Sequence, residues 1–404
     1  MNRANLTRFG PQVVGTQAVG HEFSASFKAL DASAILRLEA ESYDRVRILL
    51  NDQVVLESGQ VQSAEKVELA VQLQRENTIA IQAQDEINVR VTQMAEADLG
   101  LLNQGYFGLN TSDMERQRGF YRTLGFEGEF YPAGPETSTT FARALGFEDD
   151  YLIHVSLHSL VSPPVPPFVD TVQFRGESFR PEPPYAHLNH VGMAYATYAC
   201  ADIEADYHYL KSQGVDFVSP PATAPNGERF VFFKEPDGAF IKLVHSDTEA
   251  PPATPPNLLR LENTNMNVTD LERSREFYRL LGFTESKPAA QAGDGAFAEA
   301  HGFTGHIEFE GEDISLGAGT DGATLQLRQW RQPYDHAPPY PPPVNHLGID
   351  RINFYVKDLT AVVKTMNDLG FDQLGPIGGA PEIGIVFFFD PDGIKVQFAG
   401  PQTG

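Results

Sequence analysis

Cysteine is nearly absent from the sequence, because Cys200 is the single cysteine among 404 residues. One cysteine excludes an intrachain disulfide and any cysteine-rich metal site. Cys200 lies in the apolar stretch MAYATYACAD (193–202), which contains no histidine. A thiol in such surroundings packs as a small apolar group, so we expect Cys200 to be buried and unreactive.

Positive charge is also scarce. The sequence contains 30 Lys and Arg residues but 54 Asp and Glu residues, so its net charge is −24. Nucleic acids and anionic membrane surfaces bind clusters of Lys and Arg, so this balance argues against both as partners. The composition instead indicates a solvated acidic surface, which favours solubility.

Long hydrophobic runs are missing as well. No run of about 18 apolar residues occurs, so the sequence predicts no membrane insertion. The first residues, MNRANLTRFGPQVVG, lack the apolar segment of a signal peptide. We therefore expect a cytoplasmic protein. A secreted or periplasmic location stays open for a chain whose leader has been removed.

What the sequence does contain is a long internal repeat. Residues 108–126 read GLNTSDMERQRGFYRTLGF and residues 265–283 read NMNVTDLERSREFYRLLGF, with Asp113 and Asp270 at matching positions. Weaker copies begin at Asp202 (DIEADYHYLKSQGV) and Asp358 (DLTAVVKTMNDLGF). The four anchors predict four modules, in which the first resembles the third and the second resembles the fourth. We name these modules A (98–182), B (183–250), C (257–337) and D (338–404).

Each module predicts the same order of elements. An alternating strand precedes the Asp, the Asp caps a helix with apolar residues at helical spacing, and a glycine ends that helix. Further strands follow, and modules B and D end in hairpins around the turns EPDG (235–238) and DPDG (390–393). The expected order is therefore one strand, one helix and three strands.

The first 97 residues follow a different pattern. Short alternating stretches such as AILRLEA (34–40) and KVELAVQLQ (66–74) recur without a helical period. Strands at short, regular spacing predict an all-β sandwich domain over 1–97. A Pro-rich bridge, PPATPP (251–256), separates the two larger repeats. We therefore expect two further domains, 98–250 and 251–404, each made of two consecutive modules.

The repeated motif resembles that of the vicinal oxygen chelate superfamily. Module C reads D-L-x-x-S-x-x-F-Y-x-x-L-G-F from Asp270, and module D adds DPDG before its last strand. The superfamily includes glyoxalase I, extradiol dioxygenases, methylmalonyl-CoA epimerase and the bleomycin- and fosfomycin-resistance proteins. Over about 98–400 the resemblance implies an α+β fold, in which four βαβββ modules form two cupped-sheet domains. The N-terminal segment more weakly resembles immunoglobulin-like sandwich domains.

The resemblance also implies where a metal ion would bind. In that family a cup commonly holds a metal through a side chain near the start of the first strand and a Glu on the fourth strand. Here the first-strand positions hold Tyr106, Tyr195, Asn263 and Arg351, and the fourth-strand positions hold Gln173, Lys242, Gln326 and Gln397. None is His or Glu, and a Lys or Arg in a ligand ring repels a cation. We therefore expect no metal or other cofactor.

Four histidines keep a metal-dependent alternative open. His154 and His158 are four residues apart in a predicted strand, HVSLH, so they lie on the same face of it. His190 and His346 recur in the matched tetrapeptides NHVG (189–192) and NHLG (345–348). A glyoxalase-like or dioxygenase-like enzyme would use these as non-standard ligands of a divalent metal. The competing interpretation is a structural role for both tetrapeptides, because they occur in both domains.

The cup surfaces are expected to be rich in amides, cations and aromatic rings. The predicted ligand-binding residues are Gln173, Arg175, Asn263, Asn265, Asn267, Gln326, Arg328, Trp330, Arg351, Asn353, Tyr355 and Gln397. Guanidinium groups bind carboxylates in a bidentate manner, and amides pair with carbonyls and hydroxyls. The set predicts a small oxygenated or anionic organic ligand. A solvated polar sheet face is the alternative.

Three residues are candidates for metal-independent catalysis, namely Tyr195, Lys242 and Tyr106. An ammonium group near a phenol favours the phenolate, which would act as acid and base in an isomerase or lyase reaction. A non-catalytic protein that sequesters its ligand is the alternative function. A homodimer that exchanges modules between chains stays open, as does a protein partner bound by the N-terminal β-domain.

Overall fold

The computed structural model describes most of the chain from residue 99 onward. Its gaps there are 137–138, 149–150, 181, 248–253, 317–323 and 404. In the N-terminal region it describes the strand segments 13–16, 22–28, 33–40, 46–57, 66–72, 76–83 and 89–95. Among the described residues, no helix is long and apolar enough to cross a bilayer.

The described segments of the N-terminal region are β-strands and one turn, which agrees with the short alternating stretches. Its strands form two four-stranded antiparallel sheets. In order, one sheet contains β1 (Val13–Thr16), β8 (Val89–Ala95), β3 (Ser33–Ala40) and β6 (Lys66–Gln72), and the other β2 (Glu22–Lys28), β7 (Glu76–Ala83), β4 (Val46–Leu50) and β5 (Gln53–Glu57). Asn51 and Asp52 join β4 to β5 with φ of 50° and 65°. A tight hairpin turn of this kind favours Asn and Asp.

Modules A and B follow the expected order with small additions. Module A comprises β9 (Leu101–Asn110), α1 (Met114–Thr123), β10 (Gly128–Glu136), α2 (Thr139–Ala144), β11 (Leu152–Ser159) and β12 (Phe168–Arg175). Module B comprises β13 (Gly192–Cys200), α3 (Ile203–Ser212), β14 (Asp216–Phe217), β15 (Ala222–Thr223), β16 (Arg229–Lys234) and β17 (Phe240–His245). In each module the last strand lies parallel to the first.

Modules C and D repeat this plan. Module C comprises β18 (Leu258–Asn267), α4 (Leu271–Leu280), β19 (Glu285–Pro288), β20 (Gln291–Gly293), α5 (Ala296–Ala300), β21 (Ile307–Ser315) and β22 (Thr324–Gln332). Module D comprises β23 (Gly348–Val356), α6 (Leu359–Asp368), β24 (Gly378–Ala380), β25 (Ile383–Phe389) and β26 (Lys395–Gly400). Again the last strand of each module pairs in parallel with its first.

The repeated Asp and Gly residues have the local roles that their positions predict. Each anchor Asp accepts a hydrogen bond from the backbone N–H three residues later, at 3.0–3.1 Å, and so caps its helix. The glycines after the helices have positive φ: 88° at Gly125, 85° at Gly214, 103° at Gly282 and 82° at Gly370. Side chains with a Cβ rarely adopt this conformation, so the helix stop requires glycine.

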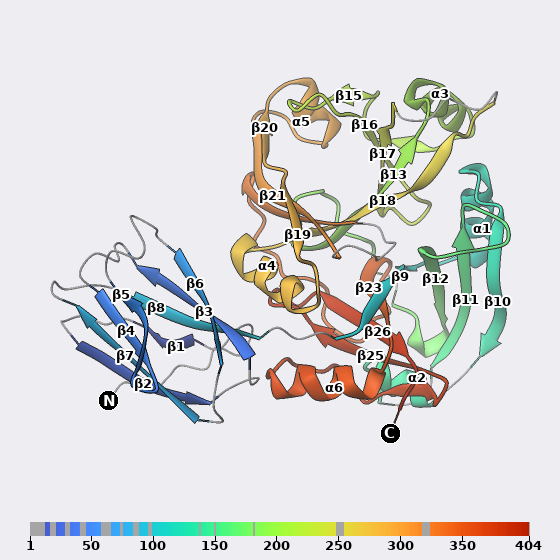
Figure 1. Cartoon of the computed structure of the whole chain (residues 1–404). Coiled ribbons are helices and arrows are strands. Elements are labelled where there is room, and N and C mark those ends of the chain that lie inside the picture. The colour runs from blue at the N-terminus through green and yellow to red at the C-terminus, as the bar shows by residue number, and fades with distance from the viewer. Residues whose placement is uncertain are drawn as a thin grey trace. The chain divides into compact units, whose positions relative to one another are not determined.

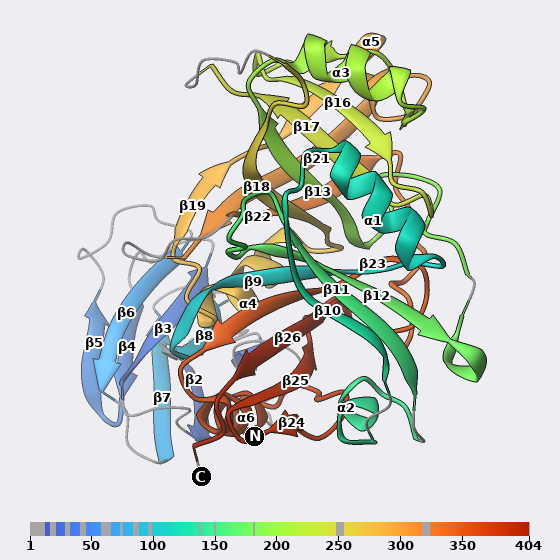
Figure 2. The same cartoon turned by 90° about the vertical axis from the view of Figure 1, so that its right-hand side faces the viewer.

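The modules share sheets in an order that the sequence did not predict. β9 of module A pairs with β23 of module D, and β13 of module B pairs with β18 of module C. The A/D sheet has the strand order β10-β11-β12-β9-β23-β26-β25-β24. The B/C sheet has the order β14-β16-β17-β13-β18-β22-β21-β19. Both sheets are strongly curved (Figures 1 and 2).

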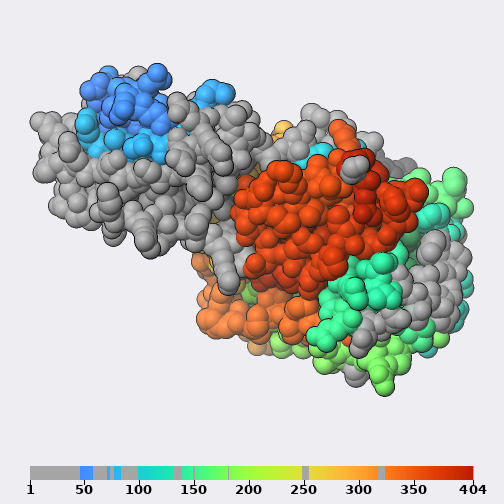
Figure 3. All heavy atoms as spheres, turned by 90° about the horizontal axis from the view of Figure 1, so that it is seen from below, coloured from blue at the N-terminus to red at the C-terminus, as the bar shows by residue number. Residues whose placement is uncertain are grey.

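The prediction that consecutive modules share a cup is therefore wrong. Each shared sheet is joined through the first strands of two modules, and these strands resemble one another in all four copies. Nothing local in the sequence selects the partner, so chain order alone misplaces it. On the surface, helix α2 of module A packs against β24 and β25 of module D (Figure 3). A Cβ on Gly378 would lie 2.5 Å from the Thr140 carbonyl oxygen, so this close approach requires glycine.

Consecutive modules are instead joined at their helix starts. Asp237, in the EPDG turn of module B, accepts hydrogen bonds from Thr111 Oγ1 (2.6 Å), the Ser112 backbone N–H (3.0 Å) and Arg116 (2.5 Å) in module A. Asp392, in the DPDG turn of module D, binds Thr269, Arg273 and Ser274 of module C in the same way. The repeated turn thus fastens module B to module A and module D to module C.

Candidate functional site

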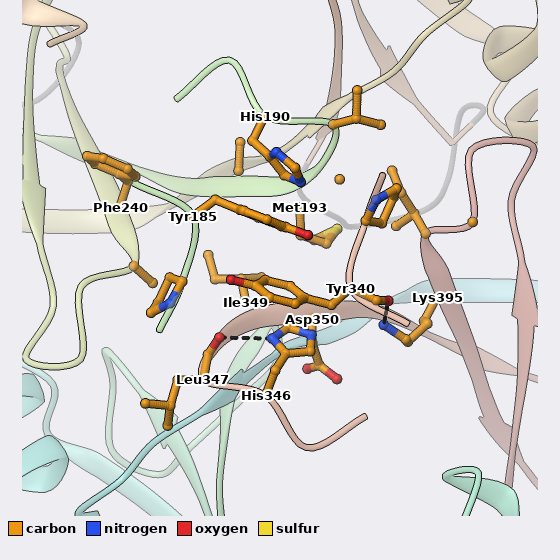
Figure 4. Close-up of a pocket in the computed structure, with 18 of the residues that line it drawn as sticks. Tyr185, His190, Met193, Phe240, Tyr340, His346, Leu347, Ile349, Asp350 and Lys395 are labelled. Carbon is orange, nitrogen blue, oxygen red and sulfur yellow. Dashed lines mark hydrogen bonds between the residues drawn. The ribbon is translucent and has the colours of Figure 1, made fainter. Parts of the chain in front are cut away.

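The A/D sheet carries a buried arginine at the centre of its cup. Arg351 Nη2 lies 2.5 Å from Asp170 Oδ2, and Arg351 Nη1 lies 2.6 Å from Asp350 Oδ1. The guanidinium Nε also donates to Gln397 Oε1 (3.2 Å), and Gln397 Nε2 donates to the Tyr106 hydroxyl (2.6 Å). All five side chains are buried. Most of their polar groups bind one another. Asp350 Oδ2, however, has no hydrogen-bond partner among the described residues, and Asp350 also lines a cavity between modules B and D (Figure 4).

Burial controls the charges of this cluster. It raises the pKa of Asp170 and Asp350, and Arg351 partly offsets the effect. Burial opposes the charge on Arg351, but Asp350 and Asp170 outweigh it and raise the guanidinium pKa. Burial also raises the pKa of the Tyr106 hydroxyl well above its ordinary value. Arg351 is therefore a fixed cation, and Tyr106 is a neutral phenol.

These residues do not fit the metal ion that the fold family implies. The guanidinium already occupies the carboxylates in the A/D cup, and a second cation beside it would be repelled. Lys242 and Arg328 have the same effect in the B/C cup. Over the described part of the chain, no three His, Cys, Asp or Glu side chains gather as a metal site would require. The expectation that the protein needs no cofactor stays a prediction.

The four candidate histidines lie apart in two kinds of surroundings. His158 stacks on Tyr121, and burial lowers its pKa to about 4. His154 Nδ1 lies 3.4 Å from Arg175 Nη2. His190 and His346 lie in the NHVG and NHLG loops, where their backbone carbonyls accept hydrogen bonds from Asn267 and Asn110, both at 2.7 Å. The backbones of both tetrapeptides are thus anchored by these amides, and Asn267 holds a loop rather than lining a cup.

Two predicted ligand residues of module A lie outside both cups. Gln173 Nε2 donates to the Ser112 carbonyl (2.7 Å), as Gln329 Nε2 does to the Thr269 carbonyl (2.6 Å) in module C. Gln173 is therefore the counterpart of Gln329, not of Gln326. Arg175 donates to Gln173 Oε1 (2.9 Å), and both residues line a hollow beside the start of helix α1. Arg175 and Arg328 are therefore not equivalent positions of the two repeats, because the alignment that paired them is shifted by three residues.

The B/C sheet contains an enclosed pocket, which we call the B/C pocket. It is small, with a cavity volume of about 30 Å³. Its residues come from both modules: Tyr195, Ala224, Asn226, Glu228, Phe230 and Lys242 of module B, and Ala289, Gln291, Phe297, His301, Phe309, Asp313, Gln326 and Arg328 of module C. Two predicted catalytic residues and two predicted ligand residues therefore meet here.

Two ion pairs dominate the pocket. Lys242 Nζ lies 2.5 Å from Glu228 Oε1, and Arg328 Nη2 lies 3.1 Å from Asp313 Oδ1. Lys242 is also 5.0 Å from the centroid of the Phe230 ring, and Arg328 is 5.6 Å from that of Phe309. The cations are therefore held between carboxylates and aromatic faces. Because the charges balance, the pocket suits an oxygen-rich ligand better than a strongly anionic one.

The titratable groups of the pocket have defined protonation states. Burial opposes the charge on Glu228, but Lys242 outweighs it and holds the pKa of that carboxyl below its ordinary value. Burial raises the pKa of the Tyr195 hydroxyl, which donates to Gln326 Oε1 at 3.4 Å. Burial lowers the pKa of His301 to about 3, so this imidazole is neutral. Glu228 is thus an ionised carboxylate that could act as a base, and Tyr195 is a proton or hydrogen-bond donor. Asp313, its neighbour in the pocket, is likewise a carboxylate through its pairing with Arg328.

The predicted catalytic set is corrected in two respects. Tyr106 lies in the A/D cup and cannot act with Tyr195 and Lys242, because modules A and B do not share a sheet. The Lys242 ammonium pairs with Glu228, so it does not favour a Tyr195 phenolate. The sequence analysis missed Glu228, Asp313 and Asp170. If the two repeats had been aligned with Gln173 opposite Gln329, Asp170 would have aligned with Gln326. That alignment would have predicted that Asp170 lies in the cup.

A more open, polar hollow adjoins the enclosed pocket. Glu228, Asp313 and Gln326 line both spaces. Asn263 lines the hollow, and its Oδ1 is buried without a hydrogen-bond partner. The neighbouring Asn265 donates weakly to the Gln326 backbone carbonyl (3.5 Å) and leaves its own Oδ1 unpaired. Unpaired amide oxygens of this kind are available to ligand N–H or O–H groups.

The remaining predicted ligand residues support the two sheets. Trp330 donates from Nε1 to Asn267 Oδ1 (3.2 Å) and packs in the hydrophobic cluster beneath the B/C pocket. Tyr355 meets Tyr106 edge to face, with ring centroids 6.4 Å apart. Asn353 donates to the Gln397 carbonyl at 3.5 Å in the A/D cup. These contacts assign packing roles to side chains that the sequence suggested for ligand binding.

The structure resembles several solved proteins. Glyoxalase I from Zea mays has a TM-score of 0.48 and 16% identity, covering 74% of this chain and 92% of that chain. A putative dioxygenase from Bacillus subtilis has a TM-score of 0.48 and 11% identity, covering 77% and 87%. A glyoxalase family protein from Bacillus cereus has a TM-score of 0.31 and 21% identity, covering 36% and 97%.

Comparison by sequence identifies the family. No curated protein sequence matches the chain significantly. The family model of the Glyoxalase/Bleomycin resistance protein/Dioxygenase superfamily matches twice, at residues 103–243 and 260–398. The two matches follow chain order, each taking in two consecutive modules, and together they span more than half of the sequence. The chain therefore belongs to the Glyoxalase/Bleomycin resistance protein/Dioxygenase superfamily.

Proposed function

We propose that the protein binds a small oxygen-rich organic molecule in the B/C pocket and catalyses a metal-independent proton transfer on it, as an isomerase or lyase does. The observation that carries this proposal is the Glu228–Lys242 pair, at 2.5 Å in a pocket lined mainly by polar side chains. A carboxylate beside a cation provides both a base and a stabiliser of developing negative charge.

The reaction would begin when a ligand carbonyl oxygen takes the Lys242 ammonium as its hydrogen-bond donor. Glu228, then less tightly paired, accepts a proton from the carbon next to the carbonyl. The electron pair of the broken C–H bond moves onto the oxygen, where Lys242 and Arg328 stabilise the enolate. When the ligand is an α-hydroxy carbonyl compound, the proton of that hydroxyl moves to the enolate oxygen. Glu228 then returns its proton to the former carbonyl carbon, which completes an isomerisation without an oxidant or a cofactor.

Tyr195 has a supporting role in this scheme. Its hydroxyl is neutral because burial raises its pKa, so it donates a hydrogen bond rather than removing a proton. Phe230 and Phe309 are buried and form an apolar side of the pocket next to the two cations. Charge interactions strengthen in such an environment, which favours the enolate.

Hydrogen exchange in D₂O tests the proposal. The full chain is incubated with dihydroxyacetone, glyceraldehyde, hydroxypyruvate and acetoin, and ¹H NMR follows loss of the proton next to the carbonyl. We expect exchange of at least one compound, reduced 100-fold or more by Glu228→Gln, with the thermal shift caused by that compound retained. Lys242→Met should lose both exchange and binding.

A matched control is Arg331→Ala, because Arg331 lies on the same strand as Arg328 but pairs with Glu310 at the exposed surface. It should leave exchange unchanged. Binding without exchange in the parent protein would contradict catalysis and favour the sequestering function. Exchange that survives Glu228→Gln would show that the base is misassigned.

A further inference from the structure

The hollow that adjoins the B/C pocket, which we call the polar hollow, is much larger than the pocket itself. Its cavity volume is about 500 Å³, against about 30 Å³ for the B/C pocket. One water molecule needs about 10–15 Å³ of such volume, so the B/C pocket admits only a small group of a ligand. The hollow has the size of ordinary ligand pockets, which measure about 300–1,000 Å³. A ligand whose carbonyl group reaches Lys242 therefore places most of its atoms in the hollow.

The two spaces lie on one sheet and share part of their lining. Strands β13 and β17 of module B and β18, β19, β21 and β22 of module C contribute residues to the hollow. Glu228, Asp313 and Gln326 line both the hollow and the B/C pocket. A single elongated molecule can thus contact the residues of both spaces.

Two buried acceptors in the polar hollow lack partners. Asn263 is 5% exposed, and its Oδ1 has no hydrogen bond within the described part of the chain. His245 Nε2 lies 3.0 Å from Asp247 Oδ1, and His245 Nδ1 is buried with no partner among the described residues. In a neutral imidazole, the nitrogen that donates to a carboxylate leaves the other nitrogen as an acceptor. Buried acceptors without partners are costly, so the hollow suits a ligand that donates to both.

The charges around the two spaces are balanced. The lining contains four carboxylates and four cations, which are Glu228, Asp313, Glu262 and Glu285, and Lys242, Arg328, Arg260 and Lys287. Six of these groups form ion pairs at 2.5–3.1 Å. The last two lie two residues apart on one face of strand β19. Neither a strongly anionic nor a cationic ligand therefore finds an excess of opposite charge.

Hydroxyl groups match this combination of unpaired acceptors and balanced charges. A hydroxyl donates one hydrogen bond and accepts others, and it carries no charge. It can donate to Asn263 Oδ1 or His245 Nδ1, and it can accept from the Lys287 ammonium. A chain of hydroxyl-bearing carbons thus suits the hollow, and the carbonyl group at its end suits the B/C pocket.

We propose that the substrate is an uncharged sugar, a pentose or hexose in its aldose or ketose form. The inference rests on the proposed proton transfer, because the carbonyl end of the sugar enters the B/C pocket. Glu228 removes the proton from the carbon that bears the neighbouring hydroxyl, and that hydroxyl passes its proton to the enolate oxygen. Glu228 then protonates the former carbonyl carbon. Aldose and ketose are thereby interconverted, and no co-reactant is needed.

Calorimetric titration of the full chain tests the substrate class with defined probes. D-xylulose, D-ribulose and D-fructose are each compared with their own terminal phosphate ester and with dihydroxyacetone, which is too short to fill the hollow. We expect at least one sugar to bind at least 10-fold more tightly than dihydroxyacetone and than its own phosphate. This comparison uses the parent protein and does not depend on any variant folding.

Two substitutions locate the site. Asn263→Leu removes the Oδ1 acceptor at similar volume, and His245→Phe keeps a ring while removing Nδ1. Each should weaken sugar binding about 10-fold or more, with near-ultraviolet circular dichroism unchanged. The matched control is His306→Phe, because His306 pairs with Asp294 at 3.2 Å but does not line the hollow. It should leave sugar binding unchanged.

The failure of this inference differs from the failure of the proposed proton transfer. If dihydroxyacetone exchanges its proton but none of the three sugars binds, the substrate class is wrong and the proton transfer stands. Phosphate esters that bind as tightly as the parent sugars also overturn the inference, as do folded Asn263→Leu and His245→Phe variants with unchanged affinity. Sugar binding without proton exchange supports the ligand class and contradicts the proton transfer.

Discussion

Arg351 and Asp170, which are 181 residues apart in the sequence, form a buried ion pair at 2.5 Å between Nη2 and Oδ2. Asp170 belongs to module A and Arg351 to module D, so the pair joins the first and last modules across their shared sheet. Arg351 also pairs with Asp350, so its single positive charge lies between two carboxylates. An arginine thus fills the cup position where the fold family commonly holds a metal ion.

Removal of this arginine should destabilise the A/D sheet strongly. Arg351→Met leaves Asp170 and Asp350 buried without a cation, and such losses typically cost about 3–5 kcal/mol. Urea unfolding followed by circular dichroism measures the loss. The double variant Arg351→Met with Asp170→Asn should recover part of it, because one unpaired carboxylate is removed. No recovery would show that packing, rather than charge, explains the effect.

Two glycine-to-alanine substitutions should change the stability of the fold in opposite directions. A Cβ on Gly108 would meet the Arg351 guanidinium, so Gly108→Ala displaces the ion cluster and should cost about 1–3 kcal/mol. Gly119 is exposed in helix α1 with nothing near the new Cβ, so Gly119→Ala should stabilise by roughly 0.5–1 kcal/mol. Thermal unfolding of both variants compares them directly. Equal effects would contradict the close approach at Gly108.

The PDG turns should contribute more to the stability of the fold than ordinary helix caps do. Asp237→Ala removes the acceptor for Thr111, Ser112 and Arg116, and Asp392→Ala does the same for Thr269, Arg273 and Ser274. Charged hydrogen bonds of this kind predict a loss of roughly 2–4 kcal/mol for each. Asp113→Ala, a cap without a contact between modules, should cost about 1 kcal/mol. Similar losses in all three variants would mean that the turns act as simple caps.

Glu235 should make the stability depend on pH near neutrality. Burial raises the pKa of its carboxyl from 4.5 to about 7. The folded state therefore binds this proton more tightly than the unfolded chain, and its stability falls as the pH rises from about 4.5 to about 7. A shift of this size corresponds to on the order of 3 kcal/mol.

Glu235→Gln isolates this contribution, because glutamine does not titrate. Urea unfolding of the parent and the variant at pH 5 and pH 8 should show the variant gaining on the parent by that amount at pH 8. A difference between the two proteins that does not change with pH would assign the titration to other groups.

Local chemistry explains what could be predicted from the sequence. The four cap-forming Asp residues and the glycines after the helices act within a few residues of their own position. Cys200 is buried, as its apolar neighbours predict, and burial raises its pKa. Module number, element order and fold family follow from such short-range patterns, because each copy of the motif encodes its own strand, cap, helix and stop.

The tertiary structure alone decided which modules share a sheet and which charges meet. β9 and β13 begin similar modules, yet β9 pairs with β23 and β13 pairs with β18. Repeated first strands present the same edges to every candidate partner, so chain order cannot distinguish them. For the same reason Tyr106 and Tyr195 lie in different cups. Glu228 comes to Lys242 from the loop before β16, and long-range contacts of this kind leave no periodic signal in the sequence.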